Sequence, residues 1–154
     1  IYVMVDAMRI LAIETSCDET AIAFVECSGD ATNPSFAVRA HVVATQIPVH
    51  RPFGGVVPSL AKREHLKNLP LVYDSVLNKL KANKLTNLKP DRIAVTIGPG
   101  LEPALWTGIN FAKELAEKVG VSLVGANHLE GHIYSNWLPQ PLTTKNYPLF
   151  TPCC

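Results

Sequence analysis

Two histidines spaced four residues apart are the side chains best placed to do chemistry. His128 and His132 come directly after a short apolar run that ends before Asn127. If the chain turns helical after Asn127, the two imidazoles lie one above the other on the same helix face. Two neutral imidazoles in this arrangement can bind one divalent metal. The spacing predicts part of a metal site, and the simpler alternative is a pair of structural histidines.

The spacing does not select a third ligand. A zinc-protease motif is disfavoured, because Glu130 lies two positions after the first histidine and so points to the other side of a helix. Six side chains with a suitable donor atom remain candidates for the third ligand: Asp18, His41, His50, His65, Cys153 and Cys154.

A polar segment at residues 14–20 separates two apolar runs near the start of the chain. Its hydroxyl and backbone N–H groups, such as those of Ser16 beside Glu14, can hold phosphate oxygens. Asp18 and Glu19 can bind a cation or accept a proton. A plain turn has the same composition, so a purely structural role is the alternative.

A third candidate segment is Gly98-Pro99-Gly100, which follows another apolar run. Glycines let the backbone approach a ligand closely, and the helix predicted after them offers its first N–H groups to an anion. Glu102 in that first turn disfavours a phosphate there. A simple strand-to-helix turn is the alternative.

Each of these segments follows a predicted strand, where ligands collect in open α/β sheets. The order of elements predicts an α/β fold with a mixed β-sheet flanked by helices. Trp106 and Phe111 are expected in the core. The predicted elements are strands 10–13, 21–25 and 38–45, a helix from Ser59 that is kinked or divided at Pro70, strand 92–97, helix 105–119 ended by Gly120, strand 121–126 and a helix after 127.

Composition narrows the class of protein. The 154 residues suffice for one domain or one lobe of a larger one. A net charge of +1 gives no global basic field, and no apolar run approaches the roughly 20 residues of a membrane span. Four cysteines without framework spacing indicate a reducing, intracellular compartment. Residues 1–7 are expected to be a non-native or disordered leader, and residues 151–154 an aberrant end of a truncated product.

Five motifs closely resemble those of the TsaD/Kae/Qri family of tRNA threonylcarbamoyladenosine transferases and occur in the order found in that family. The resemblance is closest to the bacterial members. The five motifs occupy residues 10–20, 53–58, 63–65, 98–101 and 127–132. The resemblance implies an actin-like (ASKHA) fold of two RNase H-like lobes. Residues 8–150 would then form the first lobe, and the second lobe is missing.

The resemblance also implies roles for the candidate residues. His128 and His132 would bind one divalent metal, iron or zinc, and Asp18 and Glu19 would be the acidic catalytic pair. The substrate threonylcarbamoyl-AMP is expected to contact four further residues: Glu14, Ser16, Gly98 and Gly100. In the family, the third metal ligand is an aspartate of the second lobe, so the chain alone is expected to be inactive.

The family transfers threonylcarbamoyl to N6 of the adenosine next to the anticodon, in tRNAs reading codons that begin with A. The resemblance therefore implies tRNA and, in bacteria, TsaB-like and TsaE-like subunits as partners, in the cytoplasm and without a membrane. One alternative is a non-catalytic dimerisation module of the same complex, although such relatives typically lack the paired histidines. An older endopeptidase label finds no support in the spacing.

Overall fold

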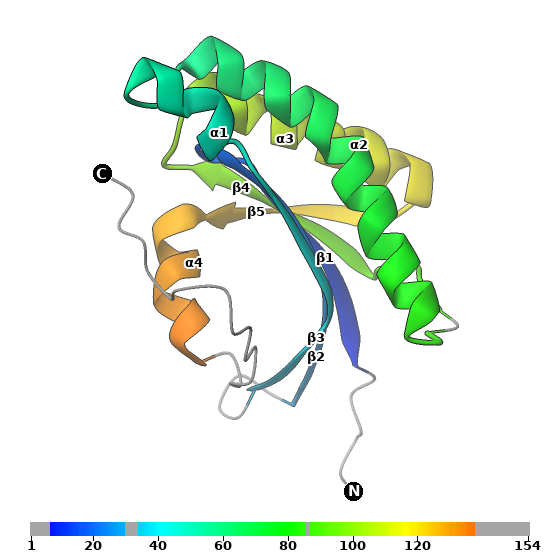
Figure 1. Ribbon diagram of the computed structural model, residues 1–154. Coiled ribbons are helices and arrows are strands. Elements are labelled where there is room, and N and C mark those ends of the chain that lie inside the picture. Colours follow the sequence, from blue (N-terminus) through cyan, green and yellow to red (C-terminus); the bar gives the residue numbers. More distant parts are fainter. Residues whose placement is uncertain (1–6, 30–33, 86, 138–154) are drawn as a thin grey trace, which may run out of the picture.

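A five-stranded mixed β-sheet forms the centre of the molecule (Figure 1). The computed structural model describes residues 7–29, 34–85 and 87–137. The sheet order is β3-β2-β1-β4-β5, with antiparallel pairing from β1 to β3 and parallel pairing of β1 with β4 and of β4 with β5. The strands are β1 (Met8–Glu14), β2 (Glu19–Gly29), β3 (Pro34–Thr45), β4 (Arg92–Gly98) and β5 (Ser122–Asn127).

The two long helices, α2 and α3, cover one face of this sheet, and the short helix α4 lies on the other side beyond the end of β5 (Figure 1). The helical elements are α1 (Ile47–His50), η1 (Arg51–Phe53), α2 (Pro58–Ala82), α3 (Glu102–Val119), α4 (His128–Tyr134) and η2 (Ser135–Trp137). None of the helices in the described ranges is both long enough and apolar enough to cross a membrane.

The hydrophobic core lies between the sheet and helices α2 and α3. Alternate strand residues point into it, because successive side chains of a strand face opposite sides of the sheet. Burying each large aliphatic side chain stabilises the fold by about 1.5–3 kcal/mol. The main core residues are Leu11, Ile13, Ile22, Phe24, Leu69, Val72, Val76, Leu80, Ile93, Val95 and Ala112.

The structure confirms the predicted mixed sheet and corrects two local predictions. Of the two alternatives predicted at Pro70, a kink or two abutting helices, the second is wrong, because α2 is one continuous helix of 25 residues. Pro70 lies on its exposed side. Trp106 is 53% exposed rather than in the core, whereas Phe111 packs against the core as predicted. The short elements α1 and η1 lie between the predicted strand 38–45 and the predicted helix from Ser59, where no helix or strand was predicted.

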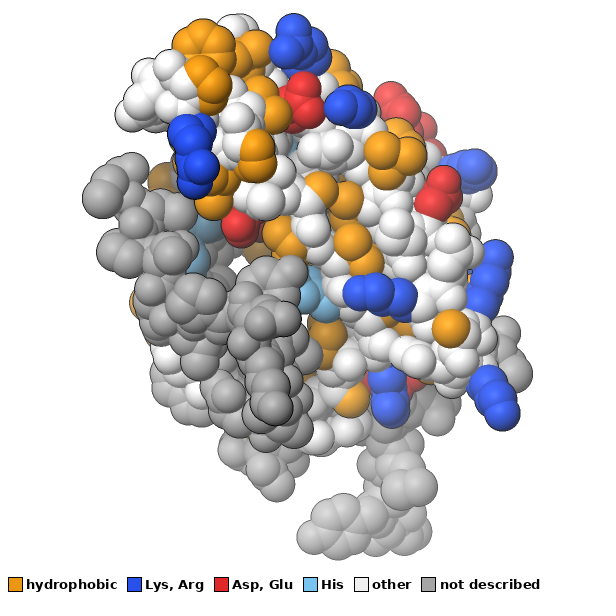
Figure 2. Space-filling model, viewed as in Figure 1, with side chains coloured by type: hydrophobic (Ala, Val, Ile, Leu, Met, Phe, Trp, Pro, Cys, Tyr) orange, Lys and Arg blue, Asp and Glu red, His pale blue; other side chains and the backbone are white. Residues whose placement is uncertain are grey.

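The surface has no concentrated basic region on the face drawn in Figure 2, where Lys and Arg side chains lie scattered among apolar and neutral groups. This dispersal agrees with the net charge of +1. The expectations for residues 1–6 and for the end of the chain, including Cys153 and Cys154, lie outside the described residues.

Candidate metal and substrate site

The carboxyl ends of β1, β4 and β5 meet at one edge of the sheet, because these three strands run parallel. The register aligns Ile13 of β1 with Val95 of β4, which brings the next pair, Glu14 and Thr96, side by side. The chain leaves β5 at Asn127, opposite Gly98 of β4. Three sequence segments far apart in the chain therefore supply side chains to one place.

Helix α4 begins at this edge and carries both histidines. Its N-cap is Asn127, whose side-chain oxygen accepts hydrogen bonds from the N–H groups of Leu129 (2.9 Å) and Glu130 (3.2 Å). Such a cap contributes about 1 kcal/mol to a helix. The helical start predicted after Asn127 is confirmed, and the two imidazoles lie on the same face of α4.

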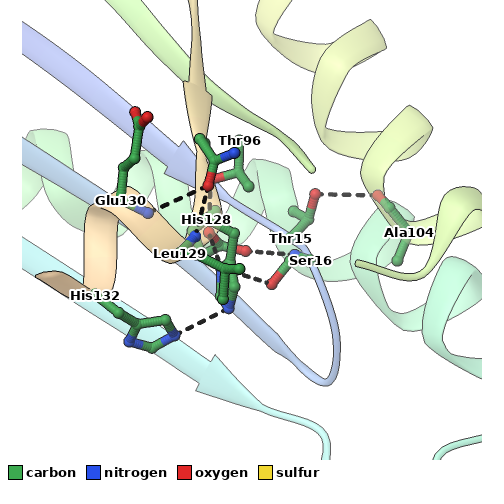
Figure 3. Close-up of polar contacts among 10 residues, drawn as sticks. Thr15, Ser16, Thr96, Ala104, His128, Leu129, Glu130 and His132 are labelled. Atoms are coloured by element: carbon green, nitrogen blue, oxygen red, sulfur yellow. Dashed lines mark hydrogen bonds and ion pairs between the residues drawn. The ribbon is translucent and has the colours of Figure 1, made fainter. Parts of the chain in front are cut away.

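The ε-nitrogens of His128 and His132 lie 2.9 Å apart, with the rings nearly perpendicular at 88° (Figure 3). Glu130 points away from both imidazoles, which agrees with the argument against a zinc-protease motif. One ε-nitrogen must donate a proton to the other for this contact to be a hydrogen bond. One of the two ε-nitrogens therefore carries a proton, and the other accepts it with a lone pair.

Glu14 determines which of the two ε-nitrogens carries the lone pair. The δ-nitrogen of His128 lies 3.2 Å from a carboxylate oxygen of Glu14 and 3.2 Å from the Ser16 hydroxyl (Figure 3). An ionised carboxylate can only accept a hydrogen bond, so this δ-nitrogen donates. A neutral His128 then has its lone pair on the ε-nitrogen, and His132 donates to it.

Glu14 is held as a carboxylate by the groups around it. Burial raises the pKa of Glu14, but hydrogen bonds from Ser16, Thr96 and His128 outweigh burial and lower the pKa below its usual value. The Thr96 hydroxyl donates over 2.5 Å, and the Ser16 N–H donates to the second carboxylate oxygen. All three donors are therefore directed at one partly buried negative charge.

The arrangement fits part of a metal site. Two metal–nitrogen bonds of about 2.0–2.1 Å place their nitrogens about 2.9–3.4 Å apart for angles of about 90–110°. The separation between the ε-nitrogens of His128 and His132 lies within this range. A carboxylate on the far nitrogen of a ligating histidine is also the usual support for such a ligand. Within residues 7–29, 34–85 and 87–137, no group of three or more His, Cys, Asp or Glu side chains could hold a metal ion.

The polar turn between β1 and β2 packs tightly against the start of α3. The buried Thr15 donates from its hydroxyl to the Ala104 carbonyl over 3.0 Å. Gly108 of α3 lies against the Thr15 side chain, where a Cβ atom would collide with it. Gly100 likewise faces Ser16, and a Cβ there would lie 2.6 Å from the Ser16 carbonyl oxygen. The predicted close approach at Gly100 is thus made to the protein's own backbone.

The two acidic residues of this turn differ in their surroundings. Asp18 is half-buried, and its carbonyl accepts a hydrogen bond of 2.8 Å from the Gln46 N–H. Glu19 is exposed at the start of β2. Burial and the negative charges of Asp18 and Glu14 raise the pKa of Glu19. The structure thus places the acidic turn next to Ser16 and Glu14, at the same sheet edge as His128.

Two of the proposed additional ligands are engaged elsewhere. The side chain of His65 is fully buried and bonds to Thr20 and the Cys17 carbonyl. His50 is also buried, and it bonds to Gln46 and to the Val57 N–H. Burial lowers the pKa of His41 on β3. None of these three joins His128 in a metal-binding group among the residues described.

Sequence reasoning missed Thr96 and the buried role of His65. Thr96 reads as an ordinary strand residue, and only the β1–β4 register places it against Glu14. The signal for His65 was available, because Ala61, His65, Leu69 and Val72 recur at the three- and four-residue spacing of one buried helix face.

Comparisons of the sequence with a family profile and with known proteins point to the same family. The sequence profile described as tRNA N6-adenosine threonylcarbamoyltransferase (TsaD) matches residues 37–154. Two relatives with that name are those of Thermosipho melanesiensis, 47% identical over 87% of this chain, and Moorella thermoacetica, 48% identical over 86%. The matched segments are 38% and 36% of those two proteins, so the chain spans little more than a third of their length.

Solved structures give the same fold. YeaZ from Pseudomonas aeruginosa matches 84% of this chain and 49% of its own, with a TM-score of 0.51 and 15% identity. Thermus thermophilus RuvC matches 83% of this chain and 68% of its own, with a TM-score of 0.50 and 13% identity. Identities this low bear on the fold alone. The two structural matches confirm the predicted RNase H-like, actin-like fold of this lobe.

Proposed function

This chain belongs to the tRNA N6-adenosine threonylcarbamoyltransferase (TsaD) family, and we propose that it supplies one wall of that enzyme's active site. The observation that carries the proposal is the pair of ε-nitrogens 2.9 Å apart on His128 and His132. The Glu14 carboxylate at 3.2 Å holds the first of these rings in position. A third metal ligand and the rest of the substrate contacts would come from residues outside this lobe.

The proposed reaction is transfer of threonylcarbamoyl from threonylcarbamoyl-AMP to N6 of the adenosine next to the anticodon. The amine nitrogen forms a bond to the carbamoyl carbon, the bond from that carbon to the phosphate oxygen breaks, and AMP leaves. The amine loses one proton in the process. An adenine amine is a weak nucleophile, so positioning of the two substrates must supply much of the rate.

The described residues can take distinct parts in this reaction. His128 and His132 would hold one divalent metal, iron or zinc, which when bound supplies Lewis-acid stabilisation of charge on the acyl group. Glu14 orients His128 through the δ-nitrogen, and Ser16 lies within 3.2 Å of the same atom. Asp18 is our candidate for accepting the proton of the amine, with Glu19 as the second member of the acidic pair.

The proposed partners follow from the family rather than from the described surface. They are a tRNA that reads codons beginning with A, threonylcarbamoyl-AMP, and TsaB-like and TsaE-like subunits if the source is bacterial. The proposed location is the cytoplasm. We assign substrate contacts within this chain to four residues at the carboxyl edge of the sheet: Glu14, Ser16, Gly98 and Gly100.

The direct test is a chimera in which this chain replaces the matched segment of the Thermosipho melanesiensis relative. We expect the purified 154-residue chain to show no turnover and the chimera to transfer threonylcarbamoyl to tRNA. His128→Ala or His132→Ala in the chimera should abolish transfer and metal retention, since either change leaves one imidazole of the pair. Product is measured as modified adenosine in digested tRNA, and metal by elemental analysis.

His41→Ala is the matched control, because it removes an imidazole from β3, away from the paired histidines. It should leave the metal content unchanged. Turnover by the chain alone would refute the expected inactivity. An unchanged metal content after either substitution in α4 would refute the assignment of the ligands.

A further inference from the structure

His65 is a buried histidine that the proposed reaction does not use. It lies in α2 and has no exposed surface. Its ε-nitrogen is 3.1 Å from the Cys17 carbonyl oxygen, and its δ-nitrogen is 2.8 Å from the Thr20 hydroxyl. Cys17 belongs to the polar turn between β1 and β2, and Thr20 to the start of β2, so the two partners lie on either side of Asp18 and Glu19.

The protonation of this imidazole is fixed by its partners. A carbonyl oxygen can only accept, so the ε-nitrogen of His65 carries the proton and donates it to Cys17. In the neutral ring the δ-nitrogen then accepts from the Thr20 hydroxyl. Burial lowers the pKa of His65, although the Cys17 carbonyl and the nearby carboxylates of Glu14 and Asp18 raise it in part.

Three consecutive carbonyls of the turn are held by three different parts of the fold. The Ser16 carbonyl accepts from the Leu101 N–H over 2.8 Å, and the Asp18 carbonyl accepts from the Gln46 N–H over 2.8 Å. The Cys17 carbonyl between them accepts from His65. Two of these donors are backbone groups that most residues would supply, whereas the third is a side chain.

We propose that His65 is a positioning residue for the acidic turn, which holds Asp18 and Glu19 in place by bonding the turn on both sides of them. The proposal rests on the proposed function in so far as Asp18 and Glu19 act in the transfer. A displacement of about 1 Å at a reacting group can cost about 100-fold in rate. A turn fixed at three successive carbonyls and at Thr20 avoids that displacement.

The first test measures the turn itself and does not need activity. In the 154-residue chain, His65→Leu removes both hydrogen bonds, and the backbone amide resonances of residues 16–20 should shift or broaden. His65→Gln places an amide N–H near the former ε-nitrogen and should restore them. His65→Asn reaches only toward Thr20 and should restore them less.

Leu69→Ala is the matched control, because it opens a cavity one turn further along the same buried face of α2, and a leucine side chain makes no hydrogen bond to the turn. Loss of a buried leucine destabilises a fold strongly enough to match a destabilising change at His65. Turn resonances that stay unchanged in His65→Leu would overturn the proposal, as would equal perturbation in Leu69→Ala.

The second test uses the chimera described above. His65→Leu should lower kcat by about tenfold or more, with little change in KM for tRNA. His65→Gln should recover more of kcat than His65→Asn, and Leu69→Ala should leave kcat near its original value at a temperature where the variants stay folded. Equal kcat in His65→Leu and the unsubstituted chimera would overturn the positioning role. If the unsubstituted chimera is inactive, the proposed function fails, and the resonance test still decides whether His65 holds the turn.

Discussion

Glu14 connects more of the candidate site than any of the residues predicted to be catalytic. Its two carboxylate oxygens accept hydrogen bonds from three chain segments: Ser16 in the turn, Thr96 at the end of β4 and His128 at the start of α4. A single partly buried negative charge therefore sets the orientation of one imidazole and the position of the turn. Such outer partners of a metal ligand normally affect affinity strongly.

Replacing Glu14 with Gln tests this connection. The amide keeps the size of the side chain but removes the charge that the δ-nitrogen proton of His128 faces. We expect affinity for Zn²⁺ to fall about 10- to 100-fold, measured by competition with a chromophoric chelator. Glu26→Gln is the control, because its carboxylate pairs with Arg39 at the outer part of the sheet, 2.6 Å away. Equal affinity in Glu14→Gln and the unchanged chain would contradict the role.

At the level of single residues, the sequence predicts the chemistry of His128 and His132 because their spacing alone places both on one helix face. It also identifies Glu14 and Ser16 as members of one polar segment. The link between Glu14 and His128 could not be predicted, since the pairing of β1 with β4 and of β4 with β5 is what brings these two residues, 114 apart in the chain, together. A histidine in an amphipathic helix, such as His65, can be assigned to the core only once the buried face is defined.

Helix α3 is positioned by close contact with the turn that it stabilises. The Thr15 hydroxyl bonds to Ala104, and Gly108 one turn later leaves room for the Thr15 side chain. The Leu101 N–H holds the Ser16 carbonyl at the same junction. The first half of α3 and the turn therefore form one tightly packed unit beneath the candidate site.

A pair of Gly→Ala variants tests this packing. Gly108→Ala puts a methyl group into the Thr15 side chain, so we expect it to destabilise the fold by about 1–3 kcal/mol. Gly131→Ala makes the same change in α4, where nothing in the described part of the chain, apart from the local helix backbone, lies within 4 Å of the added Cβ. It should stabilise its helix by about 0.5–1 kcal/mol. Urea denaturation measures both, and a neutral Gly108→Ala would show that α3 can move away from the turn.

At the level of elements, hydrophobic periodicity predicts the strands and helices well where apolar residues alternate or recur regularly. The five strands, α2 and α3 are all found, and Gly120 ends α3 in the left-handed conformation expected of a C-cap. The continuity of α2 through Pro70 was not predictable from propensity, because packing of the residues on both sides overrides the missing N–H. Trp106 lies on the exposed side of α3. Its size suggested burial, but its position around the helix determines its exposure.

For the molecule as a whole, the buried His65 makes the free energy of unfolding depend on pH. Burial lowers the pKa of His65 below the ordinary value of 6.5. The pKa of His41, an exposed residue of β3, is lowered by partial desolvation and by the charge of Lys79. Between the lowered pKa and 6.5, the unfolded chain binds protons that the folded chain does not, so stability falls as the pH falls through this window. Thermal unfolding between about pH 7.5 and 5.5 measures the effect.

His65→Gln is the informative variant for this pH dependence. Glutamine does not titrate, so the decrease in stability toward pH 5.5 should become shallower, even if the variant is less stable throughout. Raised stability at the lower pH in the unchanged chain would contradict the assigned direction. A titration of the imidazole resonances would separate the contributions of His41 and His65.

The pairing of β1 with β4 also has a consequence for the nascent chain. The meander of β1, β2 and β3 is complete by residue 45. Thr96, the partner of Glu14, is made 82 residues after Glu14. At the usual pace of about 5–20 residues per second, the ribosome needs about 4–16 s to deliver that partner. During this interval the inner edge of β1 has open backbone groups, the type of edge that recruits other strands. Translation speed across α2 therefore affects how long this edge of β1 stays uncovered.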